Sequence, residues 1–223
     1  MVDVVREAAL DAGMRVLTGT TTDAEVRDLL VQRGATSGHV QVRQVLDLTQ
    51  APRRPADPAP RPPGVSVVSW MVAVPDEILD SYAAARDAIN DAPLDTFDRE
   101  VWTSERIRGL ERAVTARGAQ TLGTALVEGG RVIGYTEMRV SNVAGSVAAT
   151  QDTAVVRDQR RRGYGTWLKA ASLLHLRSTR LDVQLVTTSN DQTNVPMLQI
   201  NRAAGFTPVA LHTHLSIALA SRG

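Results

Sequence analysis

The sequence contains no cysteine. A chain without thiols has no disulfide, no thiolate metal site and no cysteine nucleophile. It also lacks an apolar run long enough for a membrane-spanning helix, and its first residues lack the basic-then-apolar form of a secretion signal. These absences fit a cytoplasmic protein without a membrane partner.

A large excess of charge of one sign is absent too. The 25 basic and 24 acidic residues give a formal net charge of +1, which argues against a nucleic-acid partner. Apolar residues make up 43% of the chain, enough for a packed core. The composition, rich in alanine, arginine and valine, is typical of a GC-rich bacterial genome.

One basic glycine turn, at residues 159–166, organises the chain and reads Gln-Arg-Arg-Arg-Gly-Tyr-Gly-Thr. A β-rich run over 148–156 precedes it, and a helical run over 167–179 follows. Gly163 and Gly165 have no Cβ, so the backbone can turn sharply there and approach a ligand closely. Amides at a helix N-terminus attract anions, and arginines add positive charge. The pattern favours a phosphate site, with a solvated basic turn as the alternative.

This turn resembles the acetyl-CoA loop of the GNAT acetyltransferase superfamily, Arg/Gln-x-x-Gly-x-Gly/Ala. The family's next motif, Asn-x-x-Ala-x-x-Leu-Tyr-x-x-x-Gly-Phe, also has a counterpart at the same offsets. Its residues here are Asn194, Met197, Ile200, Asn201, Gly205 and Phe206. Because both motifs occur in order and at the right spacing, the chain is identified as a member of the superfamily. The resemblance implies a mixed α/β fold whose central strands splay apart around acetyl-CoA, with no metal.

The resemblance also implies which residues hold the co-substrate. Backbone groups of Val155 and Val156 would bind the pantetheine arm. Asn194 would contact the CoA arm, although its place before Val195-Pro196 also suits a helix N-cap. The pyrophosphate would lie against Arg160, Arg161, Arg162, Gly163, Tyr164, Gly165 and Thr166.

The sequence departs from the family at the expected acid. Asn201 stands where the motif has tyrosine, and an amide can donate a hydrogen bond to the CoA sulfur but cannot give up a proton. Tyr135 is an outside candidate for the acid, with a half-buried strand aromatic as the alternative interpretation.

For the base we consider Glu137 and Asp152, both on strands that line the acceptor cleft in the family. A carboxylate there can take the ammonium proton directly or through water. The alternatives are a solvated Glu137 paired with Arg139, and an Asp152 that bonds locally beside Thr153.

Two further groups of side chains are candidates for acceptor recognition. His212 and His214 share one face of the last strand, but two histidines make a poor metal site without a third ligand. An acidic, aromatic-flanked loop can hold a cationic amine, or it can be a solvated loop with its tryptophan covering the core. Its residues are Asn90, Asp91, Asp95, Asp98, Glu100 and Trp102.

The chain divides at a proline-rich stretch, residues 51–64, which we interpret as a linker. Residues 65–223 carry the helices, hairpin and β–loop–α–β–α–β order of a complete GNAT domain. Residues 1–50 repeat only the back half of that order, helix–strand–helix–strand, so the chain is similar to the end of a tandem GNAT protein of the mycothiol-synthase group. We expect residues 1–50 to dock on the complete domain or on a second chain, as a homo-oligomer would.

Two functions follow from these patterns. The first is an acetyl-CoA-dependent N-acetyltransferase that acts on a primary amine of a small molecule by direct attack. The second is an acyl-CoA-binding module that has lost catalysis and serves as a sensor or scaffold. Asn201 in place of tyrosine is the main support for the second.

Overall fold

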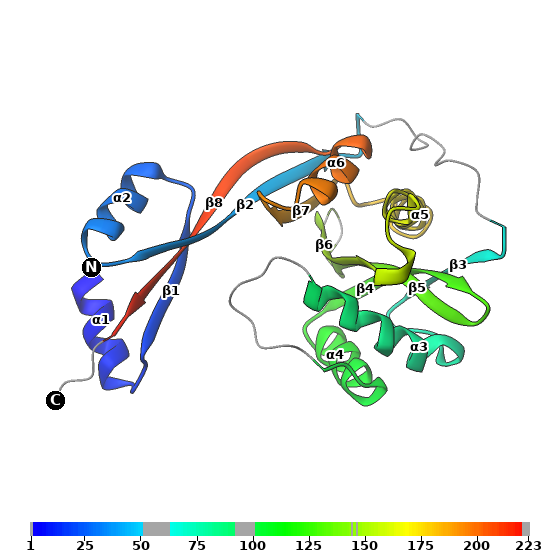
Figure 1. The fold of residues 1–223 in the computed structure, drawn as a ribbon, viewed down its shortest axis with the longest axis horizontal. Coiled ribbons are helices and arrows are strands. Elements are labelled where there is room, and N and C mark those ends of the chain that lie inside the picture. The colour runs from blue at the N-terminus through cyan, green and yellow to red at the C-terminus, as the bar shows by residue number, and fades with distance from the viewer. Residues whose placement is uncertain (1, 51–62, 92–100, 144, 146, 220–223) are drawn as a thin grey trace.

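The computed structural model has the mixed α/β fold expected from the sequence (Figure 1). It describes residues 2–50, 63–91, 101–143, 145 and 147–219. Most of the proposed linker and of the acidic loop therefore lies outside the described residues. The strands form a single eight-stranded sheet in the order β1-β8-β2-β7-β6-β5-β4-β3.

Residues 63–219 form the larger part of the fold, and α3 and α4 cover one face of its sheet while α5 covers the other (Figure 1). A short 3-10 helix, η1, continues α3, and another, η2, follows β6. The elements are β3 (Val65–Met71), α3 (Asp76–Arg86), η1 (Asp87–Asp91), α4 (Ser104–Ala116), β4 (Ala119–Glu128), β5 (Arg131–Ser141), β6 (Val147–Val155), η2 (Arg157–Gln159), α5 (Tyr164–Thr179), β7 (Leu185–Asp191), α6 (Val195–Ala203) and β8 (Thr207–Ala218).

Two helix starts are set by local features of the chain. The helix α4 has Thr103 as its N-cap, because the Thr103 hydroxyl accepts from the Arg106 amide. The helix α5 begins at Tyr164, three residues earlier than predicted, because the left-handed turn at Gly163 lets the helix start inside the glycine loop.

The parallel strands β6 and β7 pair over only three residues. Val147, Ala148 and Ala149 lie opposite Leu185, Val186 and Thr187, and no pairing follows. Both strands continue beyond this point, β6 to Val155 and β7 to Asp191. The centre of the sheet therefore opens into a gap, as the predicted splay requires.

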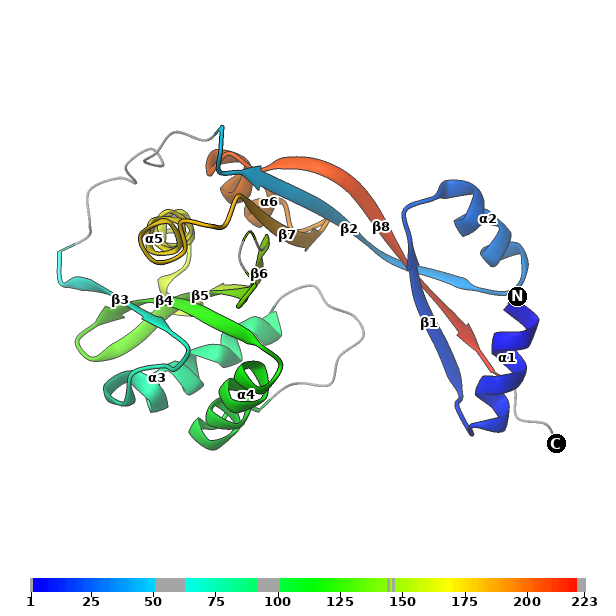
Figure 2. The same cartoon turned by 180° about the vertical axis from the view of Figure 1, so that it is seen from behind.

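Residues 2–50 contain a helix, a strand, a helix and a strand, in the predicted order. They are α1 (Val2–Asp11), β1 (Val16–Thr21), α2 (Ala24–Gln32) and β2 (Thr36–Asp47). Asp23 caps α2 by accepting from the Glu25 and Val26 amides, as its side chain predicts. With the far end of β8 these elements form an arm that projects from the larger part (Figure 2).

The arm and the larger part exchange their last strands. The strand β2 pairs with β7, and β8 pairs with β1. The two exchanged strands also pair with each other, with irregularities between Ser37 and Val40 and between Arg43 and Gln44. Each part thus contributes its last strand to the other, so the sheet runs without a break across the proposed domain boundary. None of the helices in the described part of the chain is long and apolar enough to cross a bilayer.

Candidate functional site

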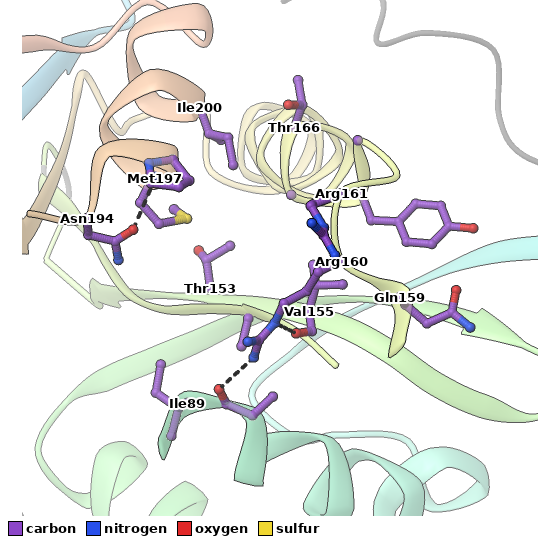
Figure 3. Close-up of a pocket in the computed structure, with 16 residues that line it drawn as sticks. Ile89, Thr153, Val155, Gln159, Arg160, Arg161, Thr166, Asn194, Met197 and Ile200 are labelled. Carbon is purple, nitrogen blue, oxygen red and sulfur yellow. Dashed lines mark hydrogen bonds between the residues drawn. The ribbon is translucent and has the colours of Figure 1, made fainter. Parts of the chain in front are cut away.

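A cavity of about 410 Å³ opens where β6 parts from β7 (Figure 3). The end of β6, the glycine loop, the start of α5 and the start of α6 form its walls, and η1 closes one side. Its lining is Ala88, Ile89, Thr153, Ala154, Val155, Gln159, Arg160, Arg161, Gly163, Tyr164, Gly165, Thr166, Asn194, Pro196, Met197 and Ile200.

The glycine loop turns through two left-handed residues before α5 begins. Gly163 has φ +79° and is the N-cap, and Arg161 has φ +62°. Only glycine adopts such angles at low cost, so the strain at Arg161 is stored in the loop. No side chain in the described part of the chain caps α5. Because the first amides of a helix have no partner within the helix, this N-terminus offers unshared donors and a partial positive charge to an anion.

Gly165 permits α5 and α6 to approach each other closely. A Cβ at this position would lie 2.8 Å from Cδ1 of Ile200, closer than packed carbon atoms come. The missing Cβ of the second glycine therefore lets the end of the Ile200 side chain lie against the loop.

Arg160 ties the loop to its surroundings. Its Nε donates to the Val155 carbonyl over 2.9 Å, and its Nη2 donates to the Ala88 carbonyl over 3.4 Å (Figure 3). The guanidinium thus joins β6 to η1 across one side of the cavity.

Asn194 is the N-cap of α6 and also lines the cavity. Its Oδ1 accepts from the Met197 amide over 3.3 Å, which makes it the N-cap of α6, and its side chain lines the cavity.

A buried ion-pair network lies behind the cavity on the α3 side of the sheet. Arg86, the last residue of α3, donates from Nη1 to Glu137 and from Nη2 to Asp152, both over 2.7 Å. The Tyr82 hydroxyl donates to Glu137 over 2.6 Å and accepts from Arg86 over 2.9 Å. The network therefore joins α3 to β5 and β6.

The network changes how the two candidate bases are interpreted. Glu137 is 5% exposed, so the alternative of a solvated residue paired with Arg139 is wrong. The side chain of Asp152 is 28% exposed. A β-bulge places Gln151 and Asp152 opposite Glu137, because the pairing shifts between Thr136 and Met138. Of the two carboxylates, only Asp152 combines this network with substantial exposure.

Burial and charge act in opposite directions on the network. Burial lowers the pKa of Arg86, but Tyr82 and Glu137 beside it raise the pKa by more than burial lowers it. The guanidinium therefore keeps its charge. Burial, reinforced by the negative charge of Glu137, raises the pKa of Tyr82 well above its usual value. The network therefore keeps Tyr82 protonated and Arg86 charged.

The comparisons with known proteins agree with this geometry. The model of the acetyltransferase (GNAT) family matches residues 84–206, more than half of the chain. This chain belongs to the GNAT acetyltransferase family. Membership makes the protein an acyltransferase, in a family whose reaction is acyl-CoA-dependent acetyl transfer.

Solved structures extend the likeness of this GNAT protein over the whole chain. A tandem GNAT protein from the clavulanic acid biosynthesis pathway, solved without AcCoA, is 26% identical, with a TM-score of 0.80 over 99% of this chain and 69% of that chain. A GCN5-related N-acetyltransferase from Kribbella flavida is 16% identical, with a TM-score of 0.62 over 97% of this chain and 73% of that chain. A GCN5-related N-acetyltransferase from Sphaerobacter thermophilus is 20% identical, with a TM-score of 0.64 over 92% of this chain and 61% of that chain. No curated protein matches the chain significantly.

Most of the predicted cofactor residues of this GNAT protein line the cavity; Val156 and Arg162 do not. The Val156 amide donates to Ile133 of β5 over 3.0 Å, and the Val155 carbonyl accepts from Arg160. These two backbone groups are therefore already bonded in this structure. A ligand that uses them would have to displace those partners.

Asn201 lies outside the cavity lining. It is fully buried, and its Nδ2 donates to Gln44 of β2 over 3.0 Å and to Asn190 of β7 over 2.8 Å. The residue that replaces the family tyrosine thus helps to hold the exchanged strand β2 in place. Tyr135, the outside candidate for the acid, is also fully buried, with its ring edge-on to Tyr82.

On the acceptor side, Trp102 packs against the buried core, which confirms the alternative interpretation of a tryptophan that covers the core. Its ring lies against two guanidinium groups, those of Arg86 at 3.8 Å and Arg106 at 4.3 Å. The Trp102 ring thus already makes cation–π contacts with arginines of the protein itself. Residues 92–100 of the acidic loop, with Asp95, Asp98 and Glu100, lie outside the described residues.

The two strand histidines lie at the base of the arm. His214 stacks on His39 of β2, with ring centroids 3.8 Å apart. In the part of the chain that the structure describes, no three histidine or acidic side chains converge as a metal site.

Sequence reasoning missed Arg86 and Tyr82. They are four residues apart on the face that α3 buries, where an apolar pattern indicates core packing and gives no sign of an ion pair. An arginine inside an apolar helical stripe was the available signal, because a buried arginine requires a buried anion.

Proposed function

We propose that this protein transfers an acetyl group from acetyl-CoA to a primary amine of a small molecule. One observation carries the proposal: an uncapped helix N-terminus, preceded by a left-handed basic turn, opens into the cavity at the splay. Those donors suit the CoA pyrophosphate, and the apolar lining from Ile89, Val155 and Met197 suits the pantetheine arm.

In the proposed reaction the amine nitrogen attacks the thioester carbonyl carbon. A C–N bond forms, the C–S bond breaks, and CoA leaves as a thiolate that takes up a proton. Asp152 first takes a proton from the ammonium, directly or through water, and so frees the neutral amine that attacks. The proton that the nitrogen loses after the attack goes to the CoA thiolate. Glu137 holds Arg86, and Arg86 in turn holds Asp152 in place.

A second candidate function is an acyl-CoA-binding module without catalysis, acting as a sensor or scaffold. The burial of Asn201 favours it, because the position that carries the usual acid in the family is turned into a structural contact. The intact loop supports acyl-CoA binding under both proposals.

The first experiment is calorimetric titration with acetyl-CoA. Gly163→Trp should abolish the binding, because the new side chain is strained at φ +79° and fills the phosphate site. Gly118→Trp is the matched control: this glycine also has a positive φ, +68°, with open space around it and no place in the cavity. An intact protein that does not bind acetyl-CoA would remove the basis of both functions.

The second experiment separates the two functions. Free CoA is measured with a thiol reagent after acetyl-CoA is mixed with a panel of small amines. The protein contributes no signal, since it has no cysteine. Amine-dependent CoA release supports the transferase, and tight binding without release for any amine leaves only the binding module.

We also propose that residues 1–50 are a partial GNAT-like unit, 65–223 a complete one and 51–64 the linker between them. The order α1-β1-α2-β2 matches α5-β7-α6-β8, and the helices α2 and α6 are followed by glycines with φ +91° at Gly34 and +92° at Gly205. Strand exchange between two like units accounts for the sheet order. A cytoplasmic location and assembly into a homo-oligomer remain predictions.

A further inference from the structure

Arg139 lies on β5 and projects toward the acceptor side of the sheet. Its neighbours Met138 and Val140 are buried in a cluster with Leu173 of α5. Because side chains alternate along a strand, Arg139 points to the opposite face, the one on which Glu137 meets α3.

This position lies beside the opening of the sheet. Arg139 is in register with Ala149 of β6, and Ala149 is paired with Thr187 of β7. That pair is the last one before β6 and β7 part. A side chain here borders the place where the proposed acceptor meets the thioester.

Arg139 has no carboxylate partner among the residues that the structure describes. Glu137, two residues earlier on the same face, bonds to Arg86 and Tyr82, and Asp152 also pairs with Arg86. Within the described ranges, Arg139 has no ion pair, and its Nε is enclosed without a hydrogen-bond partner. The side chain is only partly exposed.

The same face of the sheet carries a second guanidinium, that of Arg43, and one acid close to it, Asp191 of β7, two residues beyond Ser189. Arg43 of β2 is exposed and lies opposite Ser189 of β7. Its neighbour Gln44 bonds to Asn201 of α6, so Arg43 points to the other face, as Arg139 does. Asp191 lies diagonally across from Arg43 and offsets its charge, so Arg139 supplies the positive charge at the opening that attracts an anion.

We propose that Arg139 binds a carboxylate of the acceptor, so that the acceptor is an amino carboxylate rather than a simple alkylamine. The planar guanidinium fork matches a carboxylate in two parallel hydrogen bonds. One guanidinium balances the single charge of a carboxylate, whereas a phosphate group brings about 1.5 to 2 charges. This inference rests on the proposed function and adds the class of its acceptor.

The test compares matched pairs of acceptors. Each amino carboxylate in a series of increasing chain length is paired with its carboxamide, which has the same size and amine but no negative charge. The wild-type protein should prefer the carboxylate by roughly ten- to a hundred-fold in kcat/KM, mostly through KM, because a charged hydrogen-bonded pair is lost with the amide.

Three variants assign that preference. Arg139→Met should abolish it and leave the rate with the carboxamide unchanged, and Arg139→Lys should retain part of it. Arg202→Met is the control, since this exposed arginine on α6 lies outside the cavity lining, and it should behave as the wild type does. Acetyl-CoA binding, measured for each variant, shows that the fold is intact.

Equal rates with carboxylate and carboxamide would overturn this proposal while leaving acetyl transfer in place, as would a preference that survives in Arg139→Met. A loss of preference in Arg202→Met would also overturn it. If acetyl-CoA binds but no amine of any class is acetylated, the proposed function itself fails.

Discussion

Arg86 donates a hydrogen bond to Glu137 over 2.7 Å, and both side chains are almost completely buried. The second arm of the guanidinium reaches Asp152, so one cation serves two carboxylates on neighbouring strands. This relationship links the packing of α3 to the candidate active site, because a change at Arg86 acts on both.

Replacement of Arg86 by methionine should destabilise the protein by about 3–5 kcal/mol, since it leaves the buried Glu137 carboxylate without its partner. Urea unfolding measures the change. Arg131→Met is the matched control: Arg131 also pairs with a carboxylate, that of Asp158 over 2.8 Å, but both side chains are 56% exposed. The control should leave the unfolding midpoint nearly unchanged. Equal effects of the two substitutions would show that burial of the network is unimportant.

Lys169 of α5 should reduce stability near neutral pH. It is completely buried, its amine has no hydrogen-bond partner among the described residues, and burial lowers its pKa to about 8. Among the described residues, the ring of Phe206, 5.3 Å away, stabilises the charge of the amine. Below pH 8 the amine is protonated in both states, so the cost of burying the charge is fully present, at roughly 3 kcal/mol.

Lys169→Met should therefore raise the free energy of unfolding at pH 7 by up to roughly 3 kcal/mol. The gain should shrink as the pH rises from about 8 toward the unfolded pKa of 10.5, because the folded amine is then already neutral. Denaturant unfolding of both proteins across this range measures it. A destabilised variant at pH 7, or a gain that does not change with pH, would contradict the prediction.

His214 should make the base of the arm sensitive to acid. Burial lowers its pKa, the neighbouring His39 and His212 lower it further, and Asp191 opposes them. Because the folded pKa lies below the unfolded value, the unfolded chain takes up the proton first as the pH falls. The stability contributed by neutral His214 is complete above about pH 6.5 and is lost as the pH falls through the folded pKa. His214→Gln should flatten the fall in melting temperature between pH 6.5 and 5, and an unchanged slope would assign the fall to other groups.

Gly123 of β4 should tolerate no side chain. A Cβ there would lie 2.1 Å from atoms of the Trp70 ring, which is buried and packed edge-on to Tyr82. Gly123→Ala should cost about 1–3 kcal/mol or more, because a buried indole cannot move freely. Gly19→Ala on β1 is the control, with nothing within 4 Å of its added Cβ. Thermal unfolding of the two variants should separate them clearly.

The local structure of the glycine loop and of the second motif could be predicted because their residues lie close together in the chain. Gly163, Gly165 and Asn194 are set by local turns and caps, so the sequence contains what determines their structure. The partners of Glu137 could not be predicted in the same way. Arg86 is 51 residues away, and only the packing of α3 on β5 brings the two together.

The placement of β2 shows the same limit. Its alternating residues predict a strand, but the pattern says nothing of which strands lie beside it. Gln44 meets Asn201 across 157 residues, and this contact uses the amide that replaces the family tyrosine. The substitution therefore has a structural partner that no inspection of the motif alone would reveal.

Because the two parts exchange their last strands, the stability of the sheet depends on which strands lie side by side. It depends less on the order in which those strands follow one another along the chain. The Leu219 amide donates to the Arg15 carbonyl over 2.8 Å, so the end of β8 lies beside the start of β1. A circular permutant can link the C-terminus, after β8, to the N-terminus, before α1, and open the chain between β2 and β3. Such a permutant keeps every ladder of the sheet. A chain shortened to begin at Val65 instead strips β7 and β8 of the strand between them. The proline-rich stretch therefore suits new termini in a circular permutant. It does not suit a cut into two parts that are expressed separately.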